Sequence, residues 1–298
     1  MVHLHSNDDV LLGILIDQFL YPQNRNNINV KDAFHFYIDL EKNEADTKNL
    51  HGEMQYKYDK DTSILNLSYL EGAINVKVNY SQKSVYASVS KRVLPFKAVL
   101  GNWILTIPFS ELVKMHGLFF IHSACLEYKG KAVLFAGKSM QGKTTISMGL
   151  LSMGWDLISD DEAFLYENDY FHAVGGTEKA KLTFETWNMF SELLGETREF
   201  KGKKIIDLKK FFPDRIKEEG VIGAVCFIKP CKRDKIKEVK PIDAFERLLS
   251  IAYLNSHPEI SYKNFEFLSR LVNKINCYDL EFNTDFKALH SVLQILYK

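Results

Sequence analysis

The chain has 298 residues, with 38 basic and 38 acidic side chains, four cysteines and 46% hydrophobic residues. This length and composition are typical of a globular protein with one large domain or two ordinary ones. A formal net charge of zero argues against nucleic acid or a membrane surface as a partner, because no general electrostatic field attracts either.

Five short stretches in the first third of the chain alternate apolar and polar residues, and turn-forming residues separate them. Alternation with a period of two predicts strands. The predicted strands cover residues 33–40, 53–58, 63–70, 73–80 and 84–90. We therefore predict a mainly β, antiparallel N-terminal module over residues 1–96, with no catalytic residues in it.

The rest of the chain, residues 97–298, reads as one α/β domain. Apolar residues at helical spacing predict helical structure over 97–117, with a break or kink at Pro108. A strand containing His122 follows. The further predicted elements are strands at 131–137, 156–159 and 277–282 and helices at 143–153, 242–254, 259–275 and from Thr284, the expected N-cap of the last helix.

The cysteines and the N-terminus carry no sign of export. The four cysteines are scattered and lack zinc-site spacing, which indicates reduced thiols. The short apolar stretch at residues 10–16 follows two aspartates, whereas a signal peptide needs basic residues there. No apolar run is long enough for a membrane span. We predict a cytoplasmic protein.

The strongest motif is a glycine loop that matches the Walker A pattern G-x-x-x-x-G-K-[ST]. A buried strand precedes the loop and a helix follows it, which is the context a phosphate-binding loop requires. Backbone N–H groups and the helix N-terminus can hold phosphates, Lys143 can reach the β- and γ-phosphates, and Thr144 can bind Mg²⁺. The predicted nucleotide-binding residues are Gly137, Lys138, Ser139, Met140, Gln141, Gly142, Lys143, Thr144 and Thr145.

Two adjacent carboxylates, Asp160 and Asp161, end the strand that follows the phosphate-loop helix. Beside a phosphate loop, one carboxylate can associate with Mg²⁺ while the other accepts a proton from an attacking hydroxyl. Neighbouring side chains on a strand point to opposite faces, so both reach the site only at an irregular strand end. His122 is the third candidate, because a hairpin from Tyr128 to Lys131 would return the chain into the loop's strand and bring His122 near the loop, within reach of Asp160.

The order of His122, the loop at 137–145 and the sequence Ile-Ser-Asp-Asp at 158–161 resembles the catalytic domain of HPr kinase/phosphorylase. It is more similar still to short HPr-kinase-like proteins of peptide-modification gene clusters, including lasso-peptide serine kinases. The separations of 21 residues from His122 to Lys143 and of 17 from Lys143 to Asp160 are those expected for the family. The resemblance implies an α/β P-loop fold of the kind shared by HPr kinase and phosphoenolpyruvate carboxykinase.

The resemblance also implies roles for these residues. Asp160 would be the general base, His122 its hydrogen-bond partner, and Lys143 the contact to the transferred phosphoryl group. Thr144 and Asp161 would be associated with the metal, and the cofactors would be ATP or GTP with Mg²⁺. Glu185 is a candidate for the family's second metal-binding acid. Lys203 is a candidate for a phosphate or substrate contact, because residues 202–208 resemble the Gly-Lys segment of the kinase-like relatives.

Two departures from the family pattern bear on the substrate. The Arg-Gly-Leu-Gly-Ile type segment after the carboxylates is missing, and residues 175–179 take its place. This argues against HPr itself as the acceptor and against phosphorolysis. Met140 also stands where many relatives have glycine. Further positive charge at the phosphates would come from Lys179, Lys181 or Lys203, although each also fits a solvated surface lysine.

The sequence therefore predicts a nucleotide- and Mg²⁺-dependent kinase that phosphorylates a Ser/Thr hydroxyl of a peptide or small protein. Three alternatives stay open: a kinase for a small alcohol, a carboxykinase, and a non-catalytic nucleotide-binding switch. The carboxykinase is weak, because the seven arginines are not grouped to clamp a dicarboxylate. A homo-oligomer is compatible with the sequence.

Overall fold

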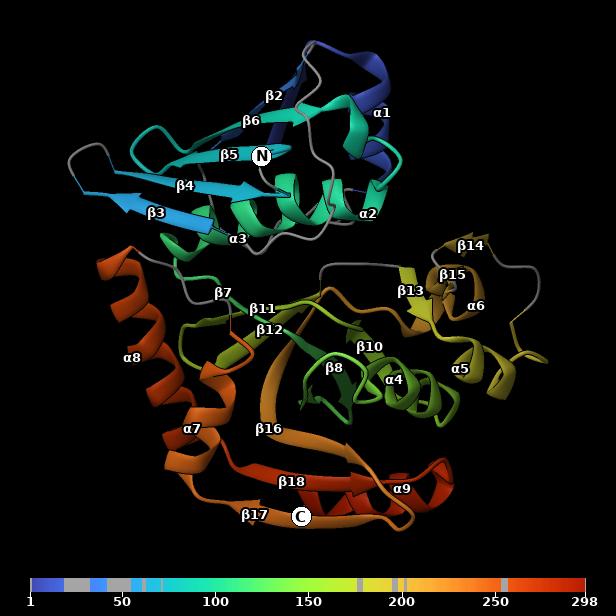
Figure 1. Cartoon of the computed structure of the whole chain (residues 1–298). Coiled ribbons are helices and arrows are strands. Elements are labelled where there is room, and N and C mark those ends of the chain that lie inside the picture. Colours follow the sequence, from blue (N-terminus) through green and yellow to red (C-terminus); the bar gives the residue numbers. More distant parts are fainter. Residues whose placement is uncertain are drawn as a thin grey trace. The chain divides into compact units, whose positions relative to one another are not determined.

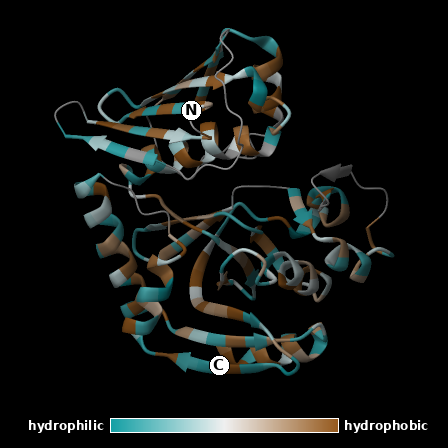
Figure 2. Cartoon of the chain, in the orientation of Figure 1, coloured by the Kyte–Doolittle hydropathy of each residue, from teal (hydrophilic) through white to brown (hydrophobic). Residues whose placement is uncertain are grey.

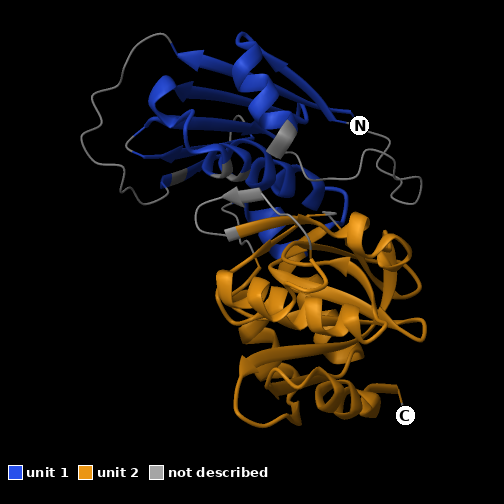
Figure 3. Ribbon diagram, turned by 90° about the vertical axis from the view of Figure 1, so that its right-hand side faces the viewer, with its two compact units in different colours: residues 1–19, 26–118, 254–263 blue, residues 20–25, 119–253, 264–298 orange. Residues whose placement is uncertain are grey.

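A computed structural model describes residues 2–18, 33–41, 55–60, 63–70, 72–175, 179–194, 198–200, 203–252 and 257–297. The chain divides into two compact units (Figure 3). The first contains residues 1–19, 26–118 and 254–263, and the second contains residues 20–25, 119–253 and 264–298.

The first unit contains a six-stranded sheet in the order β1-β2-β6-β5-β4-β3 (Figure 1). Its strands are β1 (Val2–Ser6), β2 (Phe34–Glu41), β3 (Gln55–Asp59), β4 (Ile64–Tyr69), β5 (Ile74–Asn79) and β6 (Ser84–Ser90). Apolar and polar residues alternate along these strands (Figure 2). The expectation of an antiparallel sheet is wrong for two of the five strand pairings, because β2 lies parallel to both β1 and β6. Parallel neighbours need a crossover, and the unpredicted helix α1 (Asp9–Gln18) lies in the connection from β1 to β2.

Helical structure over residues 97–114 packs on this sheet and belongs to the first unit. It comprises α2 (Lys97–Leu100), a π-helical segment η2 (Gly101–Thr106) and α3 (Ile107–Lys114). Trp103 stacks on Tyr69 with ring centroids 4.0 Å apart, and the Tyr80 hydroxyl donates to Glu111 at 3.0 Å. The compact units therefore divide after Leu118 and not at 96. Pro108 lies in the first turn of α3, and the helical segment changes from π-helix to α-helix directly before it, at Ile107.

The second unit contains a nine-stranded sheet with the central order β10-β8-β9-β16-β12-β11-β7, extended by β18 and β17. Strand β16 lies parallel to β9 and β18, and the other neighbours pair antiparallel. The strands are β7 (Phe119–Ile121), β8 (Ser123–Tyr128), β9 (Lys131–Ala136), β10 (Asp156–Ser159), β11 (Ala163–Glu167), β12 (Phe171–Gly175), β16 (Glu219–Pro230), β17 (Lys235–Val239) and β18 (Cys277–Phe282).

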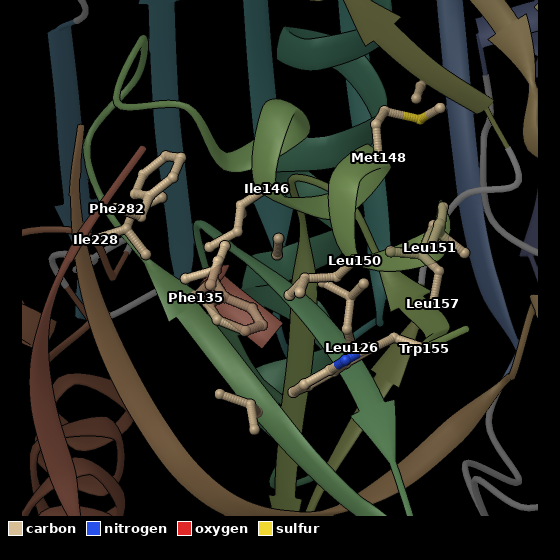
Figure 4. Close-up of a cluster of buried hydrophobic side chains, with 14 of the residues drawn as sticks. Leu126, Phe135, Ile146, Met148, Leu150, Leu151, Trp155, Leu157, Ile228 and Phe282 are labelled. Carbon is tan, nitrogen blue, oxygen red and sulfur yellow. The ribbon is translucent and has the colours of Figure 1, made fainter. Parts of the chain in front are cut away.

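Helices cover both faces of this sheet, and successive strand residues enter opposite cores. Phe135 joins a cluster with α4 (Lys143–Ser152) and α9 (Phe286–Leu293), which Figure 4 shows in part. Leu134 joins a second cluster with α7 (Pro241–Leu249) and α8 (Pro258–Lys274). The mixed α/β class predicted for this part of the chain is confirmed. Within the described residues, none of the helices has the length and apolarity needed to cross a membrane.

Three local predictions need correction or extension. Helix α7 ends at Leu249 and not at 254, and Ala252 instead forms a bridge with Ile121. The N-cap of α9 is Asp285 and not Thr284, since its carboxylate accepts from the N–H of Ala288 at 3.1 Å. A three-stranded sheet was not predicted: β13 (Lys179–Leu182), β14 (Arg198–Phe200) and β15 (Lys203–Asp207), with α5 (Phe184–Met189) and α6 (Leu208–Phe211) beside it in sequence.

Candidate active site

The predicted phosphate loop connects the buried strand β9 to α4. Gly142 caps α4 with φ +86°, a left-handed conformation that favours glycine, and an added Cβ would lie 2.8 Å from the ring of Phe282. The Gln141 side chain folds back, so that its Oε1 accepts from the N–H of Lys138 at 2.6 Å. A Cβ on Gly137 would lie 2.8 Å from this same oxygen. The backbone conformation at Gly142 therefore favours glycine, whereas a Cβ at Gly137 would displace the folded-back side chain of Gln141.

Lys143 opens α4, and its ammonium group is held over the loop. Nζ donates to the carbonyl of Gly137 at 3.0 Å and to that of Lys138 at 3.1 Å, and it lies 2.9 Å from His122 Nε2. The Lys143 side chain is 4% exposed, and Nζ is also 3.5 Å from Asp161 Oδ1. The site thus contains a buried positive charge held among backbone carbonyls, an imidazole and a carboxylate.

His122 reaches the loop through the predicted hairpin. Strands β8 and β9 pair so that Ser123 lies opposite Ala136, the residue before Gly137. Lys129 and Gly130 form the turn with φ values of +50° and +79°, which suits a two-residue hairpin loop. The N–H of His122 also donates to the carbonyl of Ile251 at 3.2 Å. Strand pairing and this anchor place the imidazole beside Lys143.

The two carboxylates lie at a bend directly after β10. The pairing of β10 with β8 shifts register between Leu157 and Ser159, and the Ser159 hydroxyl donates to the carbonyl of Glu162 at 2.5 Å. This irregular strand end brings both carboxylates to the loop. Thr144 Oγ1 donates to Asp160 Oδ2 at 3.0 Å, whereas Asp161 Oδ1 lies 3.5 Å from His122 Nδ1.

The predicted contact of His122 with Asp160 is therefore wrong, because His122 faces Asp161. Adjacent carboxylates diverge at the bend, and Asp160 turns toward the helix that begins with Lys143. The hydroxyl of Thr144 occupies one oxygen of Asp160. Residue spacing alone could not decide which carboxylate would face the imidazole, since the two positions differ by one residue.

Asp160 is buried at 3% exposure, and its Oδ1 has no hydrogen-bond partner among the described residues. Burial, followed by the negative charge of Asp161, raises the pKa of Asp160 to about 6, while the hydroxyls of Ser147 and Thr144 and the charge of Lys143 act in the opposite direction. An isolated carboxylate is costly to ionise in such a place. A cation bound next to Asp160 would therefore stabilise the ionised form of its carboxylate.

The tautomer of His122 follows from its partners. The ammonium of Lys143 only donates hydrogen bonds, so His122 Nε2 accepts and the proton of the neutral ring lies on Nδ1, toward Asp161. Burial is the main cause that lowers the pKa of His122, and Lys143 lowers it further, against the effect of Asp161. The ring is thus neutral near pH 7 and links Lys143 to Asp161.

A cavity of about 330 Å³ opens at the loop, the carboxylates and the β13–α5 segment. Three of the predicted residues beyond the loop and the carboxylates, Lys179, Lys181 and Glu185, line it. The side chain of Lys203 lies outside the described part of the structure. The lining residues are Ser139, Met140, Gly142, Lys143, Thr144, Thr145, Asp160, Asp161, Glu162, Lys179, Lys181, Thr183, Glu185, Thr186 and Met189.

Helix α5 contributes a wall of the cavity that sequence reasoning missed. Thr183 caps the helix by accepting from the N–H of Thr186 at 3.3 Å, and the Thr186 hydroxyl lies 2.8 Å from that of Thr145. The available signal was Thr183 itself, since threonine is one of the residues preferred at a helix N-cap. The bond between the two hydroxyls ties α5 to the first turn of α4.

Thr144 and Asp160 fit a magnesium ion. Both offer oxygen atoms, which Mg²⁺ prefers, and the unpartnered Oδ1 of Asp160 supplies a free ligand position. In the described parts of the chain, no cluster of three or more His, Cys, Asp or Glu side chains could hold a metal ion alone. One or two carboxylates with water and phosphate oxygens is the usual way for Mg²⁺ to bind beside a nucleotide.

Gly175 at the end of β12 allows this strand to pack closely against Ile158, just before the carboxylate bend. An added Cβ would lie 1.6 Å from the carbonyl oxygen of Ile158, two residues before Asp160. We expect Gly175→Ala to lower the free energy of unfolding by about 1–3 kcal/mol, the usual cost of overpacking, and to displace the carboxylates. Thermal unfolding checks this against Gly223→Ala, whose Cβ would lie 3.2 Å from its nearest neighbour, the Lys131 side chain, against 1.6 Å for Gly175→Ala. An equal loss of stability in both variants would contradict it.

Strand, glycine loop and helix, with two carboxylates and a histidine at the loop, define a site suited to phosphate chemistry in a mixed α/β fold. Part of the chain is similar to HPr kinase/phosphorylase of Lactobacillus acidophilus, with 32% identity over 92 residues. This confirms the predicted resemblance to the HPr kinase family. The match covers 31% of this chain, and it spans about a quarter (24%) of the relative's length.

The chain was also compared with solved structures and with family models. The HPr(Ser) kinase/phosphatase of Coxiella burnetii is matched over 59% of this chain and 93% of that one, with 15% identity and a TM-score of 0.33. No family model matches the chain.

Proposed function

We propose that this chain is a nucleotide- and Mg²⁺-dependent kinase that transfers a γ-phosphoryl group to a Ser/Thr hydroxyl of a peptide or small protein. The observation that carries the proposal is the convergence of Lys143, His122 and the two carboxylates on the glycine loop. A loop alone would suit many nucleotide-binding proteins. A buried lysine with two separately partnered carboxylates suits phosphoryl transfer in particular.

The loop amides and the N-terminus of α4 would hold the phosphates of ATP or GTP, and Lys143 would contact the transferred group. Thr144 and Asp160 would hold Mg²⁺, which when bound neutralises charge on the phosphates. The contacts favour an exchange of the roles that the resemblance implies for the two carboxylates. Asp160, buried and bonded to Thr144, would be on the metal side, and Asp161 would be the general base.

Asp161 suits a base because its side chain is 54% exposed and borders the cavity, where an acceptor hydroxyl can reach it. As the acceptor oxygen forms its bond to the γ-phosphorus, the bond from that phosphorus to the bridging oxygen breaks and nucleoside diphosphate leaves. The hydroxyl proton passes to the Asp161 carboxylate. His122, neutral and protonated on Nδ1, orients Asp161, and Lys143 stabilises the charge of the transferred group.

The similarity to HPr kinase/phosphorylase supports kinase chemistry. The acceptor type rests on the site and the resemblance. A small-alcohol kinase is the remaining enzymatic alternative.

Lys143→Met tests the proposal. We expect transfer of label from γ-labelled ATP to pooled serine peptides to fall by about 10²–10³-fold, as when one charge-stabilising donor is removed. Lys129→Met is the matched control, because it removes an exposed lysine from the turn between β8 and β9, outside the cavity lining. Equal loss in the two variants would contradict the role of Lys143. Transfer to small alcohols and to no peptide would favour the alternative.

A further inference from the structure

Met140 stands out in the phosphate loop for its backbone and its exposure. Its φ of +67° lies in the left-handed region, which costs an ordinary residue energy and glycine almost none. Its side chain is nevertheless 77% exposed, so packing in the chain does not explain it. Strained residues at functional sites persist where their side chain or backbone has a role. The loop would adopt this turn more easily with glycine, so the methionine side chain itself calls for an explanation.

A second exposed methionine borders the same cavity. Met189 ends α5 and is 50% exposed. The bond between the hydroxyls of Thr145 and Thr186 fixes α5 against α4, so Met189 is held beside the loop that carries Met140. Both side chains line the cavity together with Lys143, Asp160 and Asp161. Apolar surface is thus exposed at the place where an acceptor has to approach.

We propose that Met140 and Met189 form an acceptor-binding rim that holds a large apolar side chain next to the Ser/Thr hydroxyl of a polypeptide acceptor. This inference rests on the proposed kinase function and adds a specificity to it. Methionine is flexible and polarizable, and it recurs on surfaces that bind varied peptides. A small polar alcohol has no group that would bury these side chains.

The nucleobase is the competing occupant, and the surroundings argue against it. A pocket for a nucleobase is lined predominantly by apolar and aromatic side chains, with only a few polar groups. The other β13–α5 side chains beside Met189 in the cavity wall include the exposed charges of Lys179, Lys181 and Glu185. The cavity volume of about 330 Å³ is small for a ligand site, and phosphates with their metal ion would take up the part at the loop. We therefore infer that the acceptor, and not the nucleobase, contacts the two methionines of the rim.

The test uses the full chain, Mg·ATP and paired synthetic peptides whose single serine is flanked on both sides by either leucine or alanine. The measured quantity is the ratio of kcat/KM for the leucine peptide to that for the alanine peptide, which cancels any general loss of activity. We expect a wild-type ratio of about 10, as for burial of part of a leucine side chain. Met140→Gly and Met189→Ala should each lower the ratio at least threefold. Ile242→Ala, which removes an exposed apolar side chain from α7, should leave it unchanged.

Each outcome decides a different claim. A ratio near one in the wild type, or the same ratio in wild type and both methionine variants, would contradict the role of the rim in acceptor binding. The proposed kinase activity would not be affected by either result. A change in the preference for ATP over GTP in these variants, with the peptide ratio unchanged, would mean that Met140 and Met189 contact the nucleobase and not the acceptor. Binding of Mg·ATP without transfer to any peptide would instead remove the proposed function and the rim with it.

Discussion

The Asp161→Asn variant is expected to lose 10²–10⁴-fold in kcat for phosphoryl transfer while its affinity for Mg·ATP stays close to that of the wild type. The amide cannot accept the hydroxyl proton, and removing a general base typically costs this much. Binding should survive, because the contacts expected to hold the phosphates and the metal come from Lys143, Thr144 and Asp160. Steady-state kinetics and equilibrium titration with a fluorescent nucleotide measure the two quantities separately.

The matched control is Glu162→Gln, which removes a negative charge from the lining of the same cavity. It should reduce kcat far less, because Glu162 has no part in the proposed proton transfer. A loss as large as that of Asp161→Asn would mean that kcat depends on the negative charge of the cavity lining and not on proton acceptance by Asp161. If Asp161→Asn keeps full activity and Asp160→Asn abolishes proton transfer alone, the roles implied by the family resemblance would be restored.

Asp160→Asn is expected to stabilise the metal-free protein while it weakens Mg²⁺-dependent nucleotide binding. The pKa of Asp160 is about 6 in the folded chain, against about 4 for an ordinary aspartate, and this difference amounts to about 3 kcal/mol at neutral pH. Asparagine keeps an oxygen for the hydroxyl of Thr144 and has no charge to bury. Thermal unfolding should show a higher Tm for the variant without Mg²⁺, and a smaller rise than the wild type when Mg·ATP is added.

The pH dependence of this stabilisation has a definite sign. The folded chain binds the Asp160 proton more tightly than the unfolded chain, so the wild type loses stability as the pH rises from about 4 through about 6. The variant has no such titration. Its advantage in Tm should therefore vanish near pH 4 and be complete near pH 8. An advantage that is constant with pH would contradict the burial of this charge.

Much of the site could be predicted from the sequence because its parts are close along the chain. Strand, loop and helix are contiguous over residues 131–152, and Tyr128 and Lys131 flank a turn that sends the chain back antiparallel. That register alone sets Ser123 opposite Ala136, and His122 next to the loop. Sequence patterns that lie within one contiguous segment predict the geometry of that segment.

What could not be predicted depends on contacts between distant segments. Whether Asp160 or Asp161 faces His122 depends on a register shift in β10 that residue types do not reveal. The wall formed by α5 is joined to the loop by one hydroxyl contact across 41 residues, between Thr145 and Thr186. The parallel pairing of β2 with β6 likewise joins strands separated by three others in sequence. Alternation of apolar residues predicts strands but not their neighbours.

Phosphoryl transfer at this site is tested by following nucleotide and acceptor together in one reaction. The wild-type chain, Mg·ATP and a serine peptide are incubated, and nucleoside diphosphate, free phosphate and phosphopeptide are quantified. We expect one phosphopeptide for each diphosphate formed, little free phosphate, and loss of both products in Asp161→Asn and when Mg²⁺ is chelated. Free phosphate in place of phosphopeptide, or nucleotide binding without turnover, would contradict the assignment of this site to phosphoryl transfer.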